Sequence, residues 1–301
     1  MYKLILGDCK EKIKDIPDNS VHLILVDPPY QLGSFRKDIG KWEKENFTDS
    51  NMFNECNRVL IDGGHLLCFS SNRTLYEFGI AIKSANFEMR DTLIWKYKQS
   101  IPRNMDIGKA IDAFVTYGKT SSKYIKKIEQ EFGGDSYKIM GTNNTMFGEK
   151  KIFERKEYNV FTEEGKKFNG FGTNLAPAYE PIIMARKPFK VSLAENCIKN
   201  EVGALNINKC KEITKIFPCN ILEFKKEKKD KFNTHPMVKP IELLKYLIEM
   251  TTLKEQTVLD FTLGSGSTIV ASEYTNRYGI GIERDEKYFE IAKKRLKNIS
   301  Y

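Results

Sequence analysis

The 301-residue sequence predicts an α/β fold, in which short buried strands are covered by helices. Apolar runs of strand length recur along the chain, and between them lie segments with apolar side chains at helical spacing. One run, residues 21–26, leads directly into Asp27-Pro28-Pro29-Tyr30. Residues 257–283 follow the order strand, Gly-rich turn, helix and strand, which is the pattern of a βαβ unit. These observations predict an open sheet to which both ends of the chain contribute.

The individual elements follow from local patterns. Apolar and β-branched residues cluster in eight segments that are expected to be strands, namely 2–6, 21–26, 65–70, 87–95, 110–117, 179–187, 257–261 and 278–283. Helical spacing or capping residues predict helices at 9–16, 51–60, 72–85, 240–251, 269–274 and 285–297. Gly63 and Gly64 are expected to end the second of these helices. Residues 31–48 indicate a loop, and the charge run 225–231 indicates a linker.

Composition limits the class of protein. Hydrophobic residues make up 41% of the chain, enough for a sizeable core, yet no apolar run approaches the ~20 residues of a membrane span. The six cysteines form no Cys-x-x-Cys pair and no zinc-type Cys/His spacing, so we expect no zinc site. The sequence is typical of a reduced, cytoplasmic protein.

Positive charge is concentrated in the middle of the chain. The net charge is +9, and residues 96–231 alone hold 27 Lys and Arg against 17 Asp and Glu, a net charge of +10. A local excess of this kind favours contact with a polyanion such as a nucleic acid. Solvated faces of a Lys-rich protein would also give a positive net charge, but they would not confine the excess charge to one region.

Residues 27–30 carry a specific chemistry at the end of their strand, where ligands bind in open α/β sheets. Pro28 and Pro29 lack N–H donors, and an ionised Asp27 only accepts hydrogen bonds. The segment therefore suits a substrate that presents an NH2 group, and Tyr30 offers a flat face on which a planar ring can stack. A β-turn without function explains the same four residues, because Asp and Pro favour turns.

The Gly-rich turn has the pattern of a nucleoside site. Gly264 and Gly266 would let a ligand approach the backbone closely, and Glu283, 19 residues after Gly264, would accept hydrogen bonds from ribose hydroxyls. A dinucleotide site wants a third glycine, but Ile269 stands in that place. The segment therefore predicts a nucleoside cofactor without a pyrophosphate, with a purely structural turn as the alternative.

An amine-holding site and a nucleoside site in one sheet indicate methyl transfer from S-adenosylmethionine to a nucleobase amine. At this point the sequence resembles the amino-type DNA methyltransferases, N6-adenine or N4-cytosine, of the permuted β group. Residues 27–30 match the family's catalytic motif, 260–268 its cofactor loop, and 234–240 its His-Pro-x-x-Lys-Pro segment. One departure is that Phe261 and Thr262 follow Asp260, where the family commonly has Pro and Phe.

The resemblance implies a Rossmann-like, seven-stranded mixed methyltransferase sheet with a circularly permuted motif order and an inserted target-recognition region. Residues 1–118 would be the catalytic half, 119–232 the target-recognition region with a core strand near 179–187, and 233–301 the cofactor-binding half. The catalytic residues would be Asp27, Pro28, Pro29 and Tyr30. The cofactor-binding residues would be Asp8, Cys9, Asp27, His235, Lys239, Asp260, Phe261, Gly264, Ser265, Gly266, Ser267, Thr268, Glu283 and Arg284.

The implied activity is methylation of the N6 amine of adenine in double-stranded DNA, with the target base flipped out of the duplex and no metal required. Asp rather than Ser opens the tetrapeptide, which in the family favours adenine, and N4-cytosine is the alternative. A homodimer and a cognate restriction endonuclease are compatible with the family by analogy, and the resemblance implies a cytoplasmic protein that is encoded by a bacterium or a phage. No membrane partner is expected.

Three other classes compete with this interpretation. A dehydrogenase would want the third glycine of the Gly-rich turn, and it would not need the Asp-Pro-Pro-Tyr site. A non-catalytic DNA-binding protein would not need a nucleoside site. An RNA or protein methyltransferase is disfavoured by the large basic insertion and by Asp, in place of Asn, in the tetrapeptide.

Overall fold

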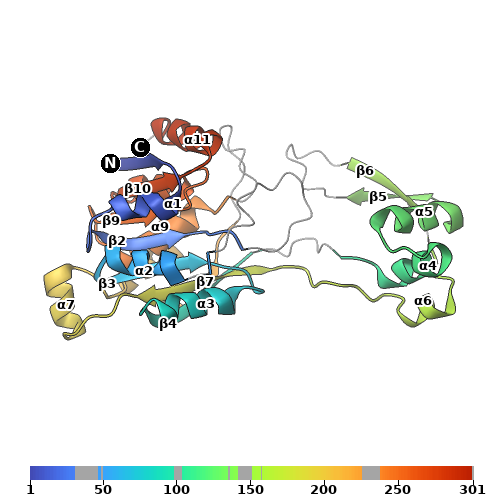
Figure 1. The fold of residues 1–301 in the computed structure, drawn as a ribbon, viewed down its shortest axis with the longest axis horizontal. Coiled ribbons are helices and arrows are strands. Elements are labelled where there is room, and N and C mark those ends of the chain that lie inside the picture. Colours follow the sequence, from blue (N-terminus) through green and yellow to red (C-terminus); the bar gives the residue numbers. More distant parts are fainter. Residues whose placement is uncertain are drawn as a thin grey trace. The chain divides into compact units, whose positions relative to one another are not determined.

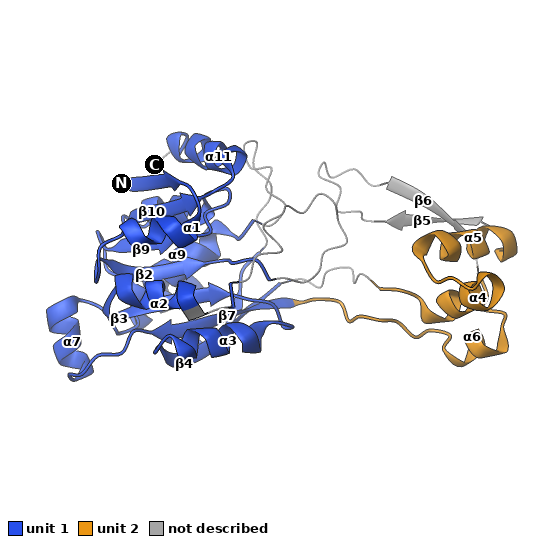
Figure 2. Ribbon diagram, in the orientation of Figure 1, with its two compact units in different colours: residues 1–98, 179–301 blue, residues 99–178 orange. Residues whose placement is uncertain are grey.

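The computed structural model describes residues 1–30, 47–48, 50–97, 104–134, 136–141, 151–156, 158–225 and 238–299. The chain forms two compact units, unit 1 with residues 1–98 and 179–301 and unit 2 with residues 99–178 (Figure 2). Of the loop expected at 31–48, only Phe47 and Thr48 lie among the described residues, and most of the charge run 225–231 lies outside them. His235 also lies outside the described residues.

Unit 1 is built on an eight-stranded mixed sheet with the strand order β1-β10-β9-β2-β3-β7-β4-β8 (Figure 1). The strands are β1 (Tyr2–Leu6), β2 (Val21–Val26), β3 (Leu60–Phe69), β4 (Glu88–Lys96), β7 (Tyr179–Arg186), β8 (Ile221–Glu223), β9 (Thr257–Asp260) and β10 (Tyr278–Glu283). β7 is antiparallel to β3 and β4, and the other neighbours pair in parallel. The first seven positions hold seven of the eight strands expected from the sequence, and the three-residue β8 adds an eighth strand at the edge.

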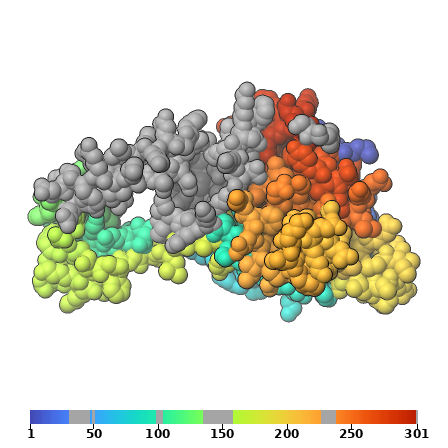
Figure 3. All heavy atoms as spheres, turned by 180° about the vertical axis from the view of Figure 1, so that it is seen from behind, coloured from blue at the N-terminus to red at the C-terminus, as the bar shows by residue number. Residues whose placement is uncertain are grey.

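Helices cover both faces of this sheet. In Figure 1, α1 (Cys9–Lys12), α2 (Ser50–Val59) and α3 (Leu75–Ser84) lie in front of it, and η1 (Ile13–Asp15) follows α1. Figure 3 shows the opposite face, where orange to red C-terminal residues form the surface. The remaining helices of unit 1 are α7 (Leu193–Asn200), α8 (Ile207–Thr214), α9 (Ile241–Thr251), α10 (Ser267–Tyr274) and α11 (Glu286–Lys297). No helix in the described ranges is long and apolar enough to cross a membrane.

The core explains why the strand before Asp27 is an unbroken apolar run. Successive strand side chains point to opposite faces of a sheet, so a strand covered on both faces needs apolar residues at every position. Leu23, Ile24, Leu25 and Val26 are all 0% exposed. β2 is therefore a central strand that is buried at every position except His22, which is partly exposed.

Unit 2 contains α4 (Ile107–Tyr117), α5 (Ser122–Phe132), α6 (Glu163–Lys167) and the antiparallel pair β5 (Ser136–Gly141) and β6 (Lys151–Lys156). The buried Asp112 joins α4 to the segment that leads into α6. Its carboxylate accepts hydrogen bonds from the Tyr158 hydroxyl at 2.7 Å, the Phe161 N–H at 3.0 Å and the Thr162 N–H at 3.1 Å. This satisfied carboxylate organises unit 2 internally.

Two sequence-based expectations for the elements were wrong. The segment 110–117 is not a strand but most of α4, because its apolar residues are framed by helix caps. The Asp106 carboxylate accepts a hydrogen bond from the Lys109 N–H at 3.2 Å, and Gly118, with φ +66°, ends the helix in the left-handed conformation. Nor do Gly63 and Gly64 end α2, since they lie inside β3, where a Cβ on Gly63 would approach Asn196 Nδ2 to 2.2 Å.

Candidate active site

The candidate site lies at the carboxyl edge of the central strands. Asp27 follows β2, Thr262 follows the parallel neighbour β9, and Glu283 ends β10. β7 runs in the opposite direction, so its first residues, including Glu180, reach the same edge. Strand order reverses between β9 and β2, and such a switch point is where open α/β sheets bind ligands.

Asp27 lies at the centre of a charged group that we call the Asp27 cluster, made of Asp27, Tyr30, Glu180 and Lys239. The Tyr30 hydroxyl donates to Asp27 Oδ1 at 2.5 Å. Lys239 Nζ lies 2.6 Å from Asp27 Oδ2 and 3.1 Å from Glu180 Oε2. The Lys239 side chain is 7% exposed, and its ammonium is 4.9 Å from the centroid of the Phe69 ring. Both oxygens of Asp27 therefore already accept hydrogen bonds from within the chain.

Burial and charge fix the protonation states of Lys239 and Tyr30. Burial by itself lowers the pKa of Lys239, but the negative charges of Asp27 and Glu180 outweigh it, so that this pKa is raised above its ordinary value. Burial, together with the same two carboxylates, raises the pKa of Tyr30 well above its ordinary value. Lys239 is therefore a cation, and Tyr30 a neutral hydrogen-bond donor, at neutral pH.

Thr262 joins the Asp27 cluster to the Gly-rich turn. The Asp27 N–H donates to Thr262 Oγ1 at 3.1 Å, and the Thr262 N–H and hydroxyl donate to Asp260 Oδ1 at 2.9 and 3.0 Å. Burial raises the pKa of Asp260 to about 6, although hydrogen bonds from Thr268 and Thr262 act in the opposite direction. Sequence reasoning treated Thr262 as a departure from a motif and did not include it in the site.

The Gly-rich turn is closed by Glu283. The Gly264 N–H donates to Glu283 Oε2 at 2.7 Å, and the Asp285 N–H donates to Oε1 at 2.8 Å. Gly264 and Gly266 have φ of +53° and +83°, which side chains rarely adopt. A Cβ on Gly266 would also come within 2.9 Å of the Ala292 Cβ on α11. The sequence-predicted spacing between the glycines and Glu283 therefore corresponds to a direct contact.

Arg295 on α11 braces the same turn. Its guanidinium donates to the Ser265 carbonyl at 2.7 Å, the Ser265 hydroxyl at 3.2 Å and the Ser267 hydroxyl at 3.0 Å. Arg295 was not predicted from the sequence, because its position in the last turn of an amphipathic helix indicates an ordinary surface cation. It is instead only 6% exposed.

The first strand also reaches this edge. The Gly7 N–H donates to the Glu283 carbonyl at 2.9 Å, and the exposed Asp8 caps α1 by accepting from the Lys10 N–H at 2.9 Å. Burial, followed by the charge of Asp8, raises the pKa of Cys9 to about 12, so that Cys9 remains a thiol. Arg284 is exposed beside Glu283.

Phe261, predicted as a cofactor contact, is 2% exposed and stacks on Phe47. The ring centroids lie 6.3 Å apart, at an interplanar angle of 13°. Phe47 comes from the end of the segment expected to be a loop, and the Lys10 ammonium lies 5.5 Å from its ring centroid. Sequence reasoning missed Phe47 as well as Glu180, although Glu180 begins a strand that was expected to rejoin the core.

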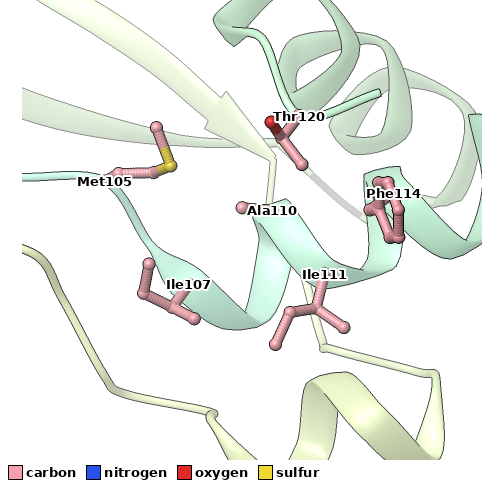
Figure 4. Close-up of a pocket in the computed structure, with 6 residues that line it drawn as sticks. All are labelled: Met105, Ile107, Ala110, Ile111, Phe114 and Thr120. Atoms are coloured by element: carbon pink, nitrogen blue, oxygen red, sulfur yellow. The ribbon is translucent and has the colours of Figure 1, made fainter. Parts of the chain in front are cut away.

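Unit 2 has an apolar hollow of its own, of about 410 Å³, shown in Figure 4. It lies along α4 and is lined by Met105, Ile107, Ala110, Ile111, Phe114 and Thr120. Phe114 is 57% exposed. Thr120 is the single polar residue in this lining, so the hollow offers contact surface rather than catalytic groups.

The largely buried Asp27 cluster and a Gly-rich turn closed by a carboxylate lie on one edge of an open α/β sheet, and this is the arrangement of a Rossmann-like methyltransferase fold. The chain belongs to the DNA methylase family of the N6/N4 type, whose family model matches residues 21–294. Its relatives include the type II methyltransferase M.HindIII of Haemophilus influenzae, 40% identical over 250 residues. That match covers 81% of this chain and 66% of M.HindIII, slightly less than two thirds of the relative's length.

Further matches cover nearly the whole chain. The DNA adenine methyltransferase YhdJ of Escherichia coli is 24% identical over 298 residues, which covers 97% of this chain and 82% of YhdJ. The crystal structure of the M1.HpyAVI–SAM complex superposes with a TM-score of 0.58 at 18% identity, covering 99% of this chain and all of that one. The PvuII DNA methyltransferase, described as cytosine-N4-specific, gives a TM-score of 0.60 at 16% identity, covering 99% of this chain and 88% of that one. These structural matches show a shared fold.

Proposed function

We propose that this chain transfers a methyl group from S-adenosylmethionine to the N6 amine of adenine in duplex DNA. The observation that carries the proposal is the 3.1 Å hydrogen bond from the Asp27 N–H to Thr262. This bond fixes an amine-accepting carboxylate beside the Gly-rich turn. Holding two reacting groups side by side makes a bimolecular step effectively unimolecular.

The residues of the Gly-rich turn fit a nucleoside cofactor. Gly264 and Gly266 leave two positions of the turn without side chains. The Glu283 carboxylate, which accepts hydrogen bonds from two backbone N–H groups, retains lone pairs for ribose hydroxyls. Ile269, at the position of the third glycine of a dinucleotide motif, is 0% exposed. Its side chain packs so closely on β10 that a Cβ on Gly279 would lie 2.8 Å from Ile269 Cγ2. When bound, S-adenosylmethionine supplies an electrophilic methyl group. We retain Asp8, Cys9, His235 and Arg284 as further candidates for holding it.

Asp27 and the Pro28 carbonyl would accept the two hydrogens of the target amine. The lone pair of a base amine is conjugated into the ring, which makes the nitrogen a poor nucleophile. Hydrogen bonds from both N–H groups of the amine to these acceptors push the nitrogen toward sp3 geometry and localise its lone pair. Pro28 and Pro29 offer no competing N–H donors, and the Tyr30 ring stacks on the base. The reaction is a direct in-line transfer in which the chain positions the groups and stabilises charge.

Residues 119–232, apart from the core strand β7, are the proposed target-recognition region, and most of unit 2 lies within them. Helix α5 of unit 2 exposes Lys123, Lys126 and Lys127, and such a basic helix face suits a phosphate backbone. A base inside a duplex hides its amine, so the base must be flipped out to reach Asp27. A second copy of the chain, a cognate restriction endonuclease and a bacterial cytoplasmic location belong to the same proposal.

Adenine is favoured over cytosine by the Asp that opens the tetrapeptide and by the similarity to YhdJ, which is a DNA adenine methyltransferase. N4-cytosine is the second candidate, because the fold is shared with the PvuII enzyme, which is described as cytosine-N4-specific. Single-molecule sequencing of DNA from cells that express the protein reports the modified base and its sequence context together. Adenine methylation at one motif is the expected result, and unmodified DNA would overturn the proposal.

A further inference from the structure

The Asp27 cluster contains one cation more than the proposed chemistry needs. Lys239 Nζ donates to Asp27 Oδ2 at 2.6 Å, the kind of contact that the target amine must itself make with the carboxylate. The other oxygen, Oδ1, accepts from the Tyr30 hydroxyl at 2.5 Å. A second lone pair remains on Oδ2, but an ammonium already bound there weakens this oxygen as an acceptor for a neutral base amine.

Glu180 gives this ammonium a second partner. Glu180 Oε2 lies 3.1 Å from Lys239 Nζ, and the Glu180 side chain is only 17% exposed. An ammonium that left Asp27 without another partner would be an unpaired charge in a largely buried site, which is strongly unfavourable. With Glu180 beside it, the ammonium remains paired while Asp27 Oδ2 becomes free.

We propose that Lys239 is a positioning residue that holds Asp27 Oδ2 in the resting protein and yields this place to the target amine by shifting onto Glu180. The inference rests on the proposed function and adds a role for two residues to it. The raised pKa of Lys239 agrees with this role, because the side chain remains a cation with either partner. Without Glu180, Lys239 has Asp27 as its only carboxylate partner in the cluster, and the base is kept out.

The test compares Glu180→Gln with the double variant Lys239→Met/Glu180→Gln. The assay is single-turnover methylation of unmethylated bacteriophage DNA with a radiolabelled methyl donor, which requires no knowledge of the recognition sequence. Glu180→Gln should slow transfer by about tenfold or more, because the target amine then competes with a charge-assisted hydrogen bond that has no alternative acceptor. Removing the lysine as well should restore most of the lost rate.

A purely structural ion pair predicts the reverse for the double variant, which would then be at least as slow as Glu180→Gln; that result would overturn the inference. Affinity for S-adenosylmethionine, measured by calorimetry, should stay unchanged in both variants. The matched control is Glu290→Gln, which breaks the exposed 2.7 Å Lys293–Glu290 pair on α11 and should leave transfer unaltered. Wild-type protein that methylates no DNA would instead refute the proposed function.

A second comparison covers the case in which Glu180→Gln does not fold. Lys239→Arg places a larger, bidentate cation between the two carboxylates, and Lys239→Met removes the cation. The inference expects Lys239→Arg to transfer methyl groups more slowly than Lys239→Met. A structural role for the pair expects Lys239→Arg to be the faster variant.

Discussion

Replacing Asp27 by alanine should abolish turnover while leaving the fold intact. The carboxylate is the only acidic group in the proposed amine-holding motif. It would accept a hydrogen bond from the amine N–H as positive charge develops on the nitrogen in the transition state. Groups that act on the transferred or departing proton contribute about 10²–10⁴-fold to a rate. We therefore expect methyl transfer by Asp27→Ala to fall by at least about 100-fold.

The structure also sets the expected stability of this variant. Asp27→Ala removes the partners of Tyr30 at 2.5 Å and of Lys239 at 2.6 Å, but Lys239 retains Glu180 at 3.1 Å. Losing hydrogen bonds of this kind costs about 1–3 kcal/mol, within the total stability of about 5–15 kcal/mol of a typical protein. Thermal unfolding should show a folded protein, and filter binding should show retained DNA affinity.

The assay is transfer of a radiolabelled methyl group to DNA under single-turnover conditions. The control is Asp18→Ala, which removes an exposed carboxylate paired with Arg58 at 2.5 Å and should leave the rate unchanged. Near-normal methylation by a folded Asp27→Ala variant would show that the active site has been misplaced.

Three further predictions concern the rest of the molecule. Gly266→Ala is strained at φ +83° and brings a Cβ close to Ala292, so it should weaken S-adenosylmethionine binding in calorimetry. Gly79→Ala, in a helix with open space around it, should bind the cofactor normally and raise the free energy of unfolding by about 0.5–1 kcal/mol. Equal cofactor affinities of the two variants would contradict this. Burial raises the pKa of Asp260 to about 6, so ionising it costs stability as pH rises from 4 through 6. In urea titrations, the free energy of unfolding of Asp260→Asn should therefore rise relative to that of the wild type by up to about 3 kcal/mol between pH 4 and pH 7. A difference between the two proteins that does not change with pH would argue against this. DNA affinity should fall steeply between about 50 and 200 mM salt because Lys and Arg release counterions, and salt-insensitive binding would count against a basic DNA-binding region.

The central strands of the sheet could be predicted from the sequence because they are largely buried on both faces. The apolar runs at 21–26, 179–187 and 257–261 need no long-range information to be recognised. The segment 110–117 was misread as a strand because Ile, Phe, Val and Thr favour β structure locally, whereas the Asp106 and Gly118 caps made it a helix. The three-residue β8 carries too short a pattern to be recognised.

The candidate site was predictable only where its residues are neighbours in sequence. Residues 27–30 and the glycines of the turn stand in short motifs, so they were found. Glu180 and Thr262 were missed, because their role arises from contacts with residues 59 or more positions away that only the sheet brings together. Lys239 was predicted to bind the cofactor, whereas in the structure its ammonium pairs with Asp27 and Glu180.

Mass spectrometry of nucleosides tests the central claim most directly. Purified protein is incubated with unmethylated DNA and S-adenosylmethionine carrying a deuterated methyl group, and the DNA is digested to nucleosides. We predict that the label appears in N6-methyladenine, and that Asp27→Ala leaves the DNA unlabelled. Label found only in N4-methylcytosine would contradict the choice of base, and the absence of label from the wild-type reaction would contradict the assignment of methyl transfer to this chain.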